Sequence, residues 1–138
     1  MKNDEKMEHL SMIQQIISRM GQNSFQIKGW SVGIMIAIFS FSGNQNKAIC
    51  ILFTIIPLFV MWFLDSYYLL LERKFRLLYN DVRISKENYN YDMNYNNVKL
   101  DVGSHSKISF IKVMFSLTEI LFYLTCILTT IFIYVLFK

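Results

Sequence analysis

Cysteine, proline and charged residues are scarce in this sequence of 138 residues. It contains two cysteines, one proline and 17% charged residues, whereas a soluble domain has about 25% charged residues. Cys50 and Cys126 each lie inside an apolar run, with no CxxC pair, and His9 and His105 stand alone in polar segments. This pattern argues against a disulfide framework or a metal site. The sequence therefore predicts no cofactor.

Recognisable catalytic motifs are also missing. The sequence has no P-loop, GxGxxG, HExxH, nucleophile elbow or pair of carboxylates beside a base, and no internal repeat. At this length the chain has room for one small domain. We therefore expect a protein that is not an enzyme and has no catalytic residues.

Apolar residues are abundant and are concentrated in two blocks, residues 29–71 and 113–137. Hydrophobic residues make up 54% of the chain and aromatic residues 16%. A transmembrane helix needs about 20 mostly apolar residues, and a polar lead-in of 28 residues is too long for a signal peptide. A polar turn at 43–47 divides the first block into an antiparallel hairpin, and Pro57 is expected to kink its second helix.

These segments predict an all-α membrane protein with three transmembrane helices. The expected parts are a cytoplasmic amphipathic helix (1–28), two spans (29–46 and 47–71), a helix extension with a polar loop (72–112) and a third span (113–137). Twelve of the 14 basic residues fall before residue 29 or between 72 and 112. Because basic residues favour the cytoplasmic side, we expect a protein of the bacterial inner membrane, with its N-terminus inside and its C-terminus outside.

The cytoplasmic segments carry three further patterns. An apolar stripe in the N-terminal helix either lies in the lipid interface, packs on a second copy or covers the chain's own cytoplasmic part; it comprises Leu10, Ile13, Ile17, Met20 and Ile27. The extension of the second helix has a basic face that either anchors it at the membrane or holds lipid phosphates or an anionic nucleotide or oligonucleotide ligand; it comprises Arg73, Lys74, Arg76 and Arg83. Residues 85–106 are expected to form a loop, with one short strand at 97–102.

Two acidic residues, Asp65 and Glu119, lie inside the expected spans. Asp65 lies seven positions before Glu72, and Glu119 lies seven positions after Lys112. Seven residues are about 10 Å of helix, so we expect both acids at similar depth. Acids within a membrane face protein or water. Either neighbouring groups satisfy each acid, or both line an aqueous path in a homo-oligomer, as acidic rings do in cation channels.

Particular neighbours are available for each alternative. Local partners for Asp65 are Ser66, a tyrosine hydroxyl or Lys28, and for Glu119 they are Ser116, Thr118 or Lys112. Thr118 and Thr125 share one face of the third span and either line a path or contact a partner helix.

Two segments resemble a family of small, largely uncharacterised bacterial multi-pass membrane proteins. SFQIKGWS, at 24–31, has the Lys-Gly-Trp motif that opens the first span in that family. FLDSYYLLLERKFRLLYNDVR, at 63–83, has its Leu-Asp-x-Tyr-Tyr-Leu-x-x-Glu-Arg-x-Phe-Arg motif. The resemblance covers roughly residues 25–83 and carries over Lys28, Gly29, Trp30, Asp65, Tyr67, Tyr68, Glu72, Arg73 and Arg76. Within the hairpin, Lys28 and Asp65 are expected to approach as an ion pair.

The size and layout are similar to those of the membrane effectors that accompany nucleotide-signalling enzymes in antiphage defence. The leading hypothesis is a homo-oligomeric membrane effector that forms a channel or pore and is gated from the cytoplasm. The alternative is a membrane anchor or scaffold that conducts nothing and recruits a cytoplasmic protein. The expected partners are membrane lipids, further copies of the chain, and a cytoplasmic protein or anionic ligand.

Overall fold

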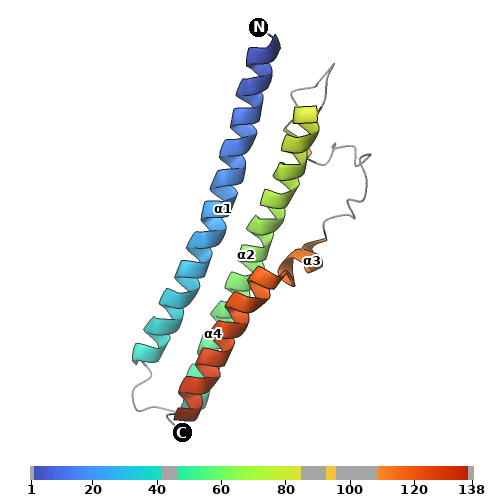
Figure 1. Ribbon diagram of the computed structural model, residues 1–138. Coiled ribbons are helices and arrows are strands. Elements are labelled where there is room, and N and C mark those ends of the chain that lie inside the picture. Colours follow the sequence, from blue (N-terminus) through green and yellow to red (C-terminus); the bar gives the residue numbers. More distant parts are fainter. Residues whose placement is uncertain (1, 42–46, 85–92, 96–108, 137–138) are drawn as a thin grey trace.

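The computed structural model describes residues 2–41, 47–84, 93–95 and 109–136. These residues form four helices and contain no strand (Figure 1). The helices are α1 (Lys2–Phe41), α2 (Lys47–Ile84), α3 (Phe110–Met114) and α4 (Leu117–Leu136). The all-helical architecture predicted from the sequence is therefore present in the described part of the chain.

Helix α1 is one unbroken helix of 40 residues. The N-terminal helix expected at 1–28 and the first span expected at 29–46 are continuous with each other, at least to Phe41. No proline interrupts this stretch, and glycine within a helix costs only about 1 kcal/mol. The N-terminal apolar stripe and the start of the expected first span therefore belong to one continuous helix.

Helix α2 is 38 residues long and continues through Pro57. It contains both the second span and the extension to Arg83 that the unbroken apolar pattern predicted. Proline removes one helical hydrogen bond. The helix persists on either side of this residue because α1 packs along it, as Figure 1 shows.

The third span begins later than the sequence suggested. A break at Phe115 and Ser116 separates α3 from α4. The Phe115 amide donates to the Ile111 carbonyl at 3.0 Å, and the Ser116 amide donates to the Val113 carbonyl at 3.0 Å. The Trp62 indole N–H of α2 donates to the Met114 carbonyl at 3.2 Å, which satisfies one carbonyl at the end of α3. Lys112 and Glu119 therefore lie on different helices.

Two apolar clusters hold the helices together. In the N-terminal half of α1, Ile13 packs on Leu78 and Val82 of α2. Farther along, Met35, Leu58 and Cys126 form a second cluster that joins α1, α2 and α4. Of the three alternatives for the N-terminal stripe, the structure shows the third, packing within the chain, since Ile13 lies against α2.

The packing places α1 and α2 side by side and antiparallel, with α4 against their lower part (Figure 1). The C-terminal end of α4 lies at the same end of the molecule as the C-terminal end of α1 and the N-terminal end of α2, opposite the start of α1 (Figure 1).

Two of the described helices are long and apolar enough to span a membrane, over Phe53–Ile84 and Leu117–Val135. The expected first span is described only to residue 41, so it remains a prediction. The strand expected at 97–102 lies outside the described residues. Of the expected 85–106 loop, the structure describes 93–95, where Met93 packs on the Ile13 cluster and the Tyr95 ring lies 5.4 Å from that of Phe75.

Candidate functional site

Lys28 lies at the centre of a polar cluster where α1, α2 and α4 meet. Its ammonium group contacts Asp65 Oδ2 and lies 2.9 Å from Glu119 Oε1 and 3.2 Å from Ser24 Oγ. Ser24 and Lys28 are four residues apart and so share one face of α1. An ammonium group has three N–H donors, and these three contacts use all of them.

Asp65 is fully buried and well supplied with donors. Its side chain has 0% exposure. Oδ2 accepts from Lys28 and from the Tyr123 hydroxyl at 3.2 Å, and Oδ1 accepts from the Ser24 hydroxyl. Three donors from two helices therefore surround this carboxylate and satisfy both of its oxygens.

Glu119 is equally buried but has fewer hydrogen-bond donors around it. Its side chain is 1% exposed, and its hydrogen bond in the cluster is the one that Oε1 accepts from Lys28. Oε2 is buried and has no hydrogen-bond partner among the described residues. With both acids ionised, the cluster would carry a net charge of −1 in a region of low dielectric.

Aromatic rings surround the cluster. Tyr123 is 2% exposed and stacks on Trp62 at 5.7 Å. The Phe122 ring lies 5.9 Å from the Lys28 ammonium. These rings exclude water from the carboxylates, so electrostatic interactions within the cluster are stronger than they would be at a surface.

The structure therefore brings together three of the residues selected from the sequence: Lys28, Asp65 and Glu119. All three belong to one cluster, in which both acids use the same ammonium. Neither Ser24 nor Tyr123 was selected from the sequence. Ser24 had one detectable signal, because it interrupts the N-terminal apolar stripe four residues before Lys28. No feature of the sequence singled out Tyr123, because tyrosine is common in membrane spans.

The selected threonines do not join this cluster. Thr118 and Thr125 are exposed on α4. The Thr125 hydroxyl donates to the Leu121 carbonyl at 2.6 Å, which leaves it little need of another partner. Thr118 lies 3.4 Å from Ser116 Oγ. Both residues face away from the acids of the same chain.

The basic residues of α2 are divided among different contacts. Arg76 forms an ion pair with Glu72 at 2.6 Å, and the Lys74 ammonium lies 4.8 Å from the centre of the Tyr95 ring. The Arg83 side chain is exposed, and its carbonyl accepts from Lys6 at 3.3 Å. The structure thus presents a basic helix surface, with Arg76 already partnered.

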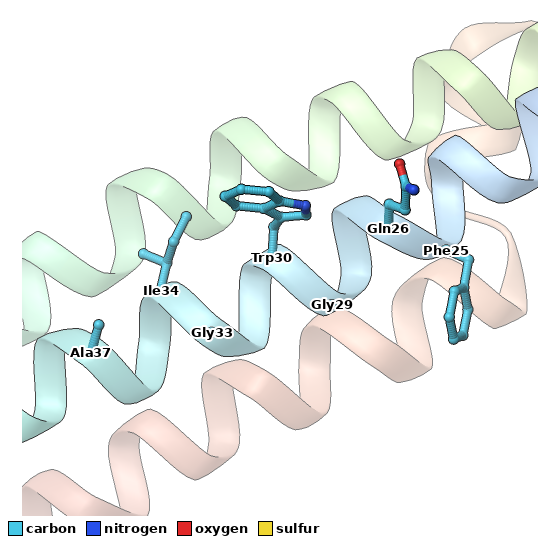
Figure 2. A pocket seen from close by; sticks show the side chains of 7 residues that line it. All are labelled: Phe25, Gln26, Gly29, Trp30, Gly33, Ile34 and Ala37. Atoms are coloured by element: carbon cyan, nitrogen blue, oxygen red, sulfur yellow. The ribbon is translucent and has the colours of Figure 1, made fainter.

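A shallow, mostly apolar hollow lies on the outer face of α1. All of its lining residues belong to this helix (Figure 2): Phe25, Gln26, Gly29, Trp30, Gly33, Ile34 and Ala37. A Cβ atom added at Gly29 or Gly33 would meet nothing within 4 Å. Small residues at four-residue spacing on an exposed face are typical of helix contacts in membranes.

Among the described residues, no group of three or more His, Cys, Asp or Glu side chains could hold a metal ion. Comparisons with known protein families, with curated proteins and with solved structures found no match to this chain.

Proposed function

We propose that the chain is a homo-oligomeric effector of the bacterial inner membrane that forms a channel or pore gated from the cytoplasm. The observation that carries the proposal is the buried cluster of Lys28, Asp65 and Glu119 at the contact of three helices. Buried charges of this kind are costly in a membrane and usually serve ion pathways or switches. A role in antiphage defence is supported by the similar size and layout of membrane effectors in such systems.

The continuity of α1 supports a route for gating. Ile13, in the cytoplasmic contact with α2, and Lys28, in the cluster, lie on the same helix. Fifteen residues of helix span about 22 Å. A ligand or partner that displaces the N-terminal half of α1 would therefore pull Lys28 away from both acids without any intervening joint.

The burial of the acids determines how they would act. Asp65 and Glu119 face the interior of the single chain, so they do not line a path in this closed arrangement. Withdrawal of Lys28 would leave two carboxylates without their cation, and carboxylates in a water-filled path attract cations. The proposed closed state is thus one in which Lys28 holds both acids and offsets the charge of one carboxylate.

Three helices are too few to enclose a pore, so conduction requires several copies of the chain. The hollow on α1 supports such association, since Gly29 and Gly33 allow another helix to approach closely.

The proposed orientation has α1 starting in the cytoplasm and α4 ending outside, because basic residues gather at one end. Reporter fusions at each terminus test it.

Gating by an anionic nucleotide or a cytoplasmic protein would use the basic surface of α2. The ion pair given above for this surface joins Arg76 to Glu72 and does not involve Arg73, Lys74 or Arg83.

The first experiment is to record membrane potential in cells after induced expression. The native protein is compared with the Asp65→Asn, Glu119→Gln double variant. We expect rapid depolarisation by the native protein and at least a tenfold slower change with the double variant, because the variant lacks both carboxylates.

Glu72→Gln is the matched control, since it removes a carboxylate that pairs with Arg76 outside the cluster. It should depolarise cells like the native protein. Equal depolarisation by native protein and double variant would remove the acids from the mechanism. Absence of depolarisation in all three strains, with and without co-expressed cytoplasmic partners, would contradict the channel proposal.

A scaffold that recruits a cytoplasmic protein is the second candidate function. It is favoured by two apolar side chains on the cytoplasmic part of α1, Met7 and Met12, which are 68% and 45% exposed. A scaffold predicts that the two acid substitutions leave function intact, whereas deletion of residues 86–106 abolishes it.

A further inference from the structure

The two carboxyl groups of the cluster differ in their hydrogen-bond environment. Asp65 accepts from three donors: Lys28, Ser24 and Tyr123. Glu119 accepts from Lys28 alone, through Oε1. Its other oxygen is buried and has no partner among the described residues. One acid is therefore arranged as an anion, and the other is not.

The charge balance points in the same direction. The titratable groups that face Glu119 are Lys28 on α1, Asp65 on α2 and Tyr123 on its own helix. One ammonium offsets one carboxylate, so a second ionised carboxylate would be a buried and uncompensated charge. Such a charge costs far more than burial of a neutral O–H group, and buried acids usually take up a proton instead.

We propose that the cluster is a binding site for one exchangeable proton, which resides on Glu119 Oε2 at neutral pH. Lys28 is then the cation, Asp65 is the anion, and Glu119 is a neutral carboxylic acid. Its carbonyl oxygen, Oε1, accepts from Lys28, and the proton occupies the oxygen that otherwise has no partner. This site does not depend on whether the chain conducts ions.

A proton fits this position better than a metal ion does. An alkali or alkaline-earth ion requires several oxygen ligands at once. The oxygens of Asp65 and Ser24 already take part in hydrogen bonds within the cluster. A proton needs only one oxygen, and Glu119 Oε2 is an oxygen without a hydrogen-bond partner among the described residues. The Lys28 side chain is 23% exposed, which gives the site a connection to the outside through which the proton exchanges.

The test is infrared spectroscopy of the purified full-length protein in lipid nanodiscs at neutral pH. A protonated carboxyl group has a carbonyl stretching band separate from those of carboxylates, and the band shifts in heavy water. We expect the native protein to have one such band and Glu119→Gln to lack it. Glu72→Gln should keep the band, because Glu72 pairs with Arg76 as an anion.

Asp65→Asn provides a second test, in which the band should be lost without any change to Glu119 itself. With Asp65 neutral, Lys28 has only Glu119 as a counter-ion, so Glu119 should ionise and the band should disappear although Glu119 is still present. Retention of the band in Asp65→Asn would overturn the assignment of the charge to Asp65. A native spectrum identical to that of Glu119→Gln in this region would overturn the proton site.

Thermal unfolding keeps the proposal falsifiable if a variant gives too little protein for spectroscopy. Glutamine closely mimics a protonated glutamate, so Glu119→Gln should unfold within about 2 °C of the native protein, a shift of only a few tenths of a kcal/mol. Asp65→Asn should lower the midpoint of thermal unfolding by more than Glu119→Gln does. A larger drop for Glu119→Gln than for Asp65→Asn would contradict the proposal. Neither the infrared measurement nor the thermal unfolding depends on depolarisation. Failure of the channel proposal would therefore leave the test of the proton site unaffected.

Discussion

Lys28 links all three long helices through its contacts in the cluster. Its ammonium bonds Ser24 on its own helix, Asp65 on α2 and Glu119 on α4. Removing one partner of a buried ion pair leaves an uncompensated charge and costs about 3–5 kcal/mol. The physical role of Lys28 is thus to make the burial of two acids tolerable.

We expect Lys28→Met to lower the free energy of unfolding by about 3–5 kcal/mol, because Asp65 loses its counter-ion while it remains buried. Chemical denaturation in detergent micelles measures this. Lys74→Met is the matched control. It removes only an interaction with the Tyr95 ring, worth about 0.5–1 kcal/mol at an exposed site.

A compensating substitution makes the prediction specific. Adding Asp65→Asn to Lys28→Met removes both charges, so the double variant should recover part of the lost stability. Simple additivity of the two losses would show that the two residues do not interact in the membrane.

His9 is the second residue with a testable electrostatic role. It lies near the start of α1 and is 5% exposed. Burial lowers the pKa of its imidazole below the usual value of 6.5. The released form of the helix therefore binds a proton more readily than the docked form does. The contribution of His9 to docking is fully present above pH 6.5 and is lost as the pH falls below that value.

We expect the N-terminal part of α1 to separate from α2 in mildly acidic conditions. Spin labels at Met12 and Asn80, both exposed, measure the distance between the helices in a variant without cysteine. The distance distribution should broaden between pH 7.5 and 5.5. His9→Phe should remove this pH dependence, and an equal response in both proteins would contradict the assignment to His9.

At the scale of the elements, α1 and α2 are held together by different chemistry in their two halves. The N-terminal half of α1 depends on an apolar contact of Ile13 with Leu78 and Val82 of α2. The C-terminal half of α1 adds the ion cluster and the Met35 contact with Leu58 and Cys126. The two halves should therefore respond separately to substitution.

We expect Ile13→Ala to cost about 2–5 kcal/mol, because it leaves a cavity at a side chain with 0% exposure. Hydrogen exchange should accelerate in the first turns of α1 and remain slow near Lys28. Met12→Ala, at a position 45% exposed, is the neighbouring control and should change little. Equal acceleration along the whole of α1 would show that the two halves open together.

For the whole molecule, the outer face of α1 is the surface that we propose for self-association. A Cβ atom added at Gly29 or Gly33 would meet no other atom within 4 Å, so we expect larger side chains there to leave the packing within one chain intact. They would block the close approach of another helix.

Gly33→Leu should therefore preserve the helical fold and dissociate the proposed oligomer, lowering its mass in native mass spectrometry to that of one chain. Ile36→Leu is the control, since Ile36 is 56% exposed and does not line the hollow. An unchanged mass for Gly33→Leu would place the oligomer contact on a different face.

Much of the architecture could be predicted from the sequence. The two apolar blocks and their polar turn predicted antiparallel helices, and the pattern after Leu71 predicted an extension of the second helix. Hydrophobic periodicity and run length are local properties, and local properties determine where a helix forms. The rarity of charge within the blocks also made Asp65 and Glu119 conspicuous before any fold was known.

Other features were decided only by the tertiary structure. The Lys28–Asp65 approach was expected within the hairpin, but the sharing of Lys28 with Glu119 depends on how α4 docks. The break at Phe115 and Ser116 depends on Trp62 reaching the end of α3.

The sequence by itself thus determined which segments are helical and which buried charges need partners, because hydrophobicity and charge belong to each residue. Only the tertiary structure decided that both acids share one ammonium, and that Glu119 Oε2 has no donor among the described residues. These depend on contacts between residues up to 91 positions apart, and no local pattern specifies such distances.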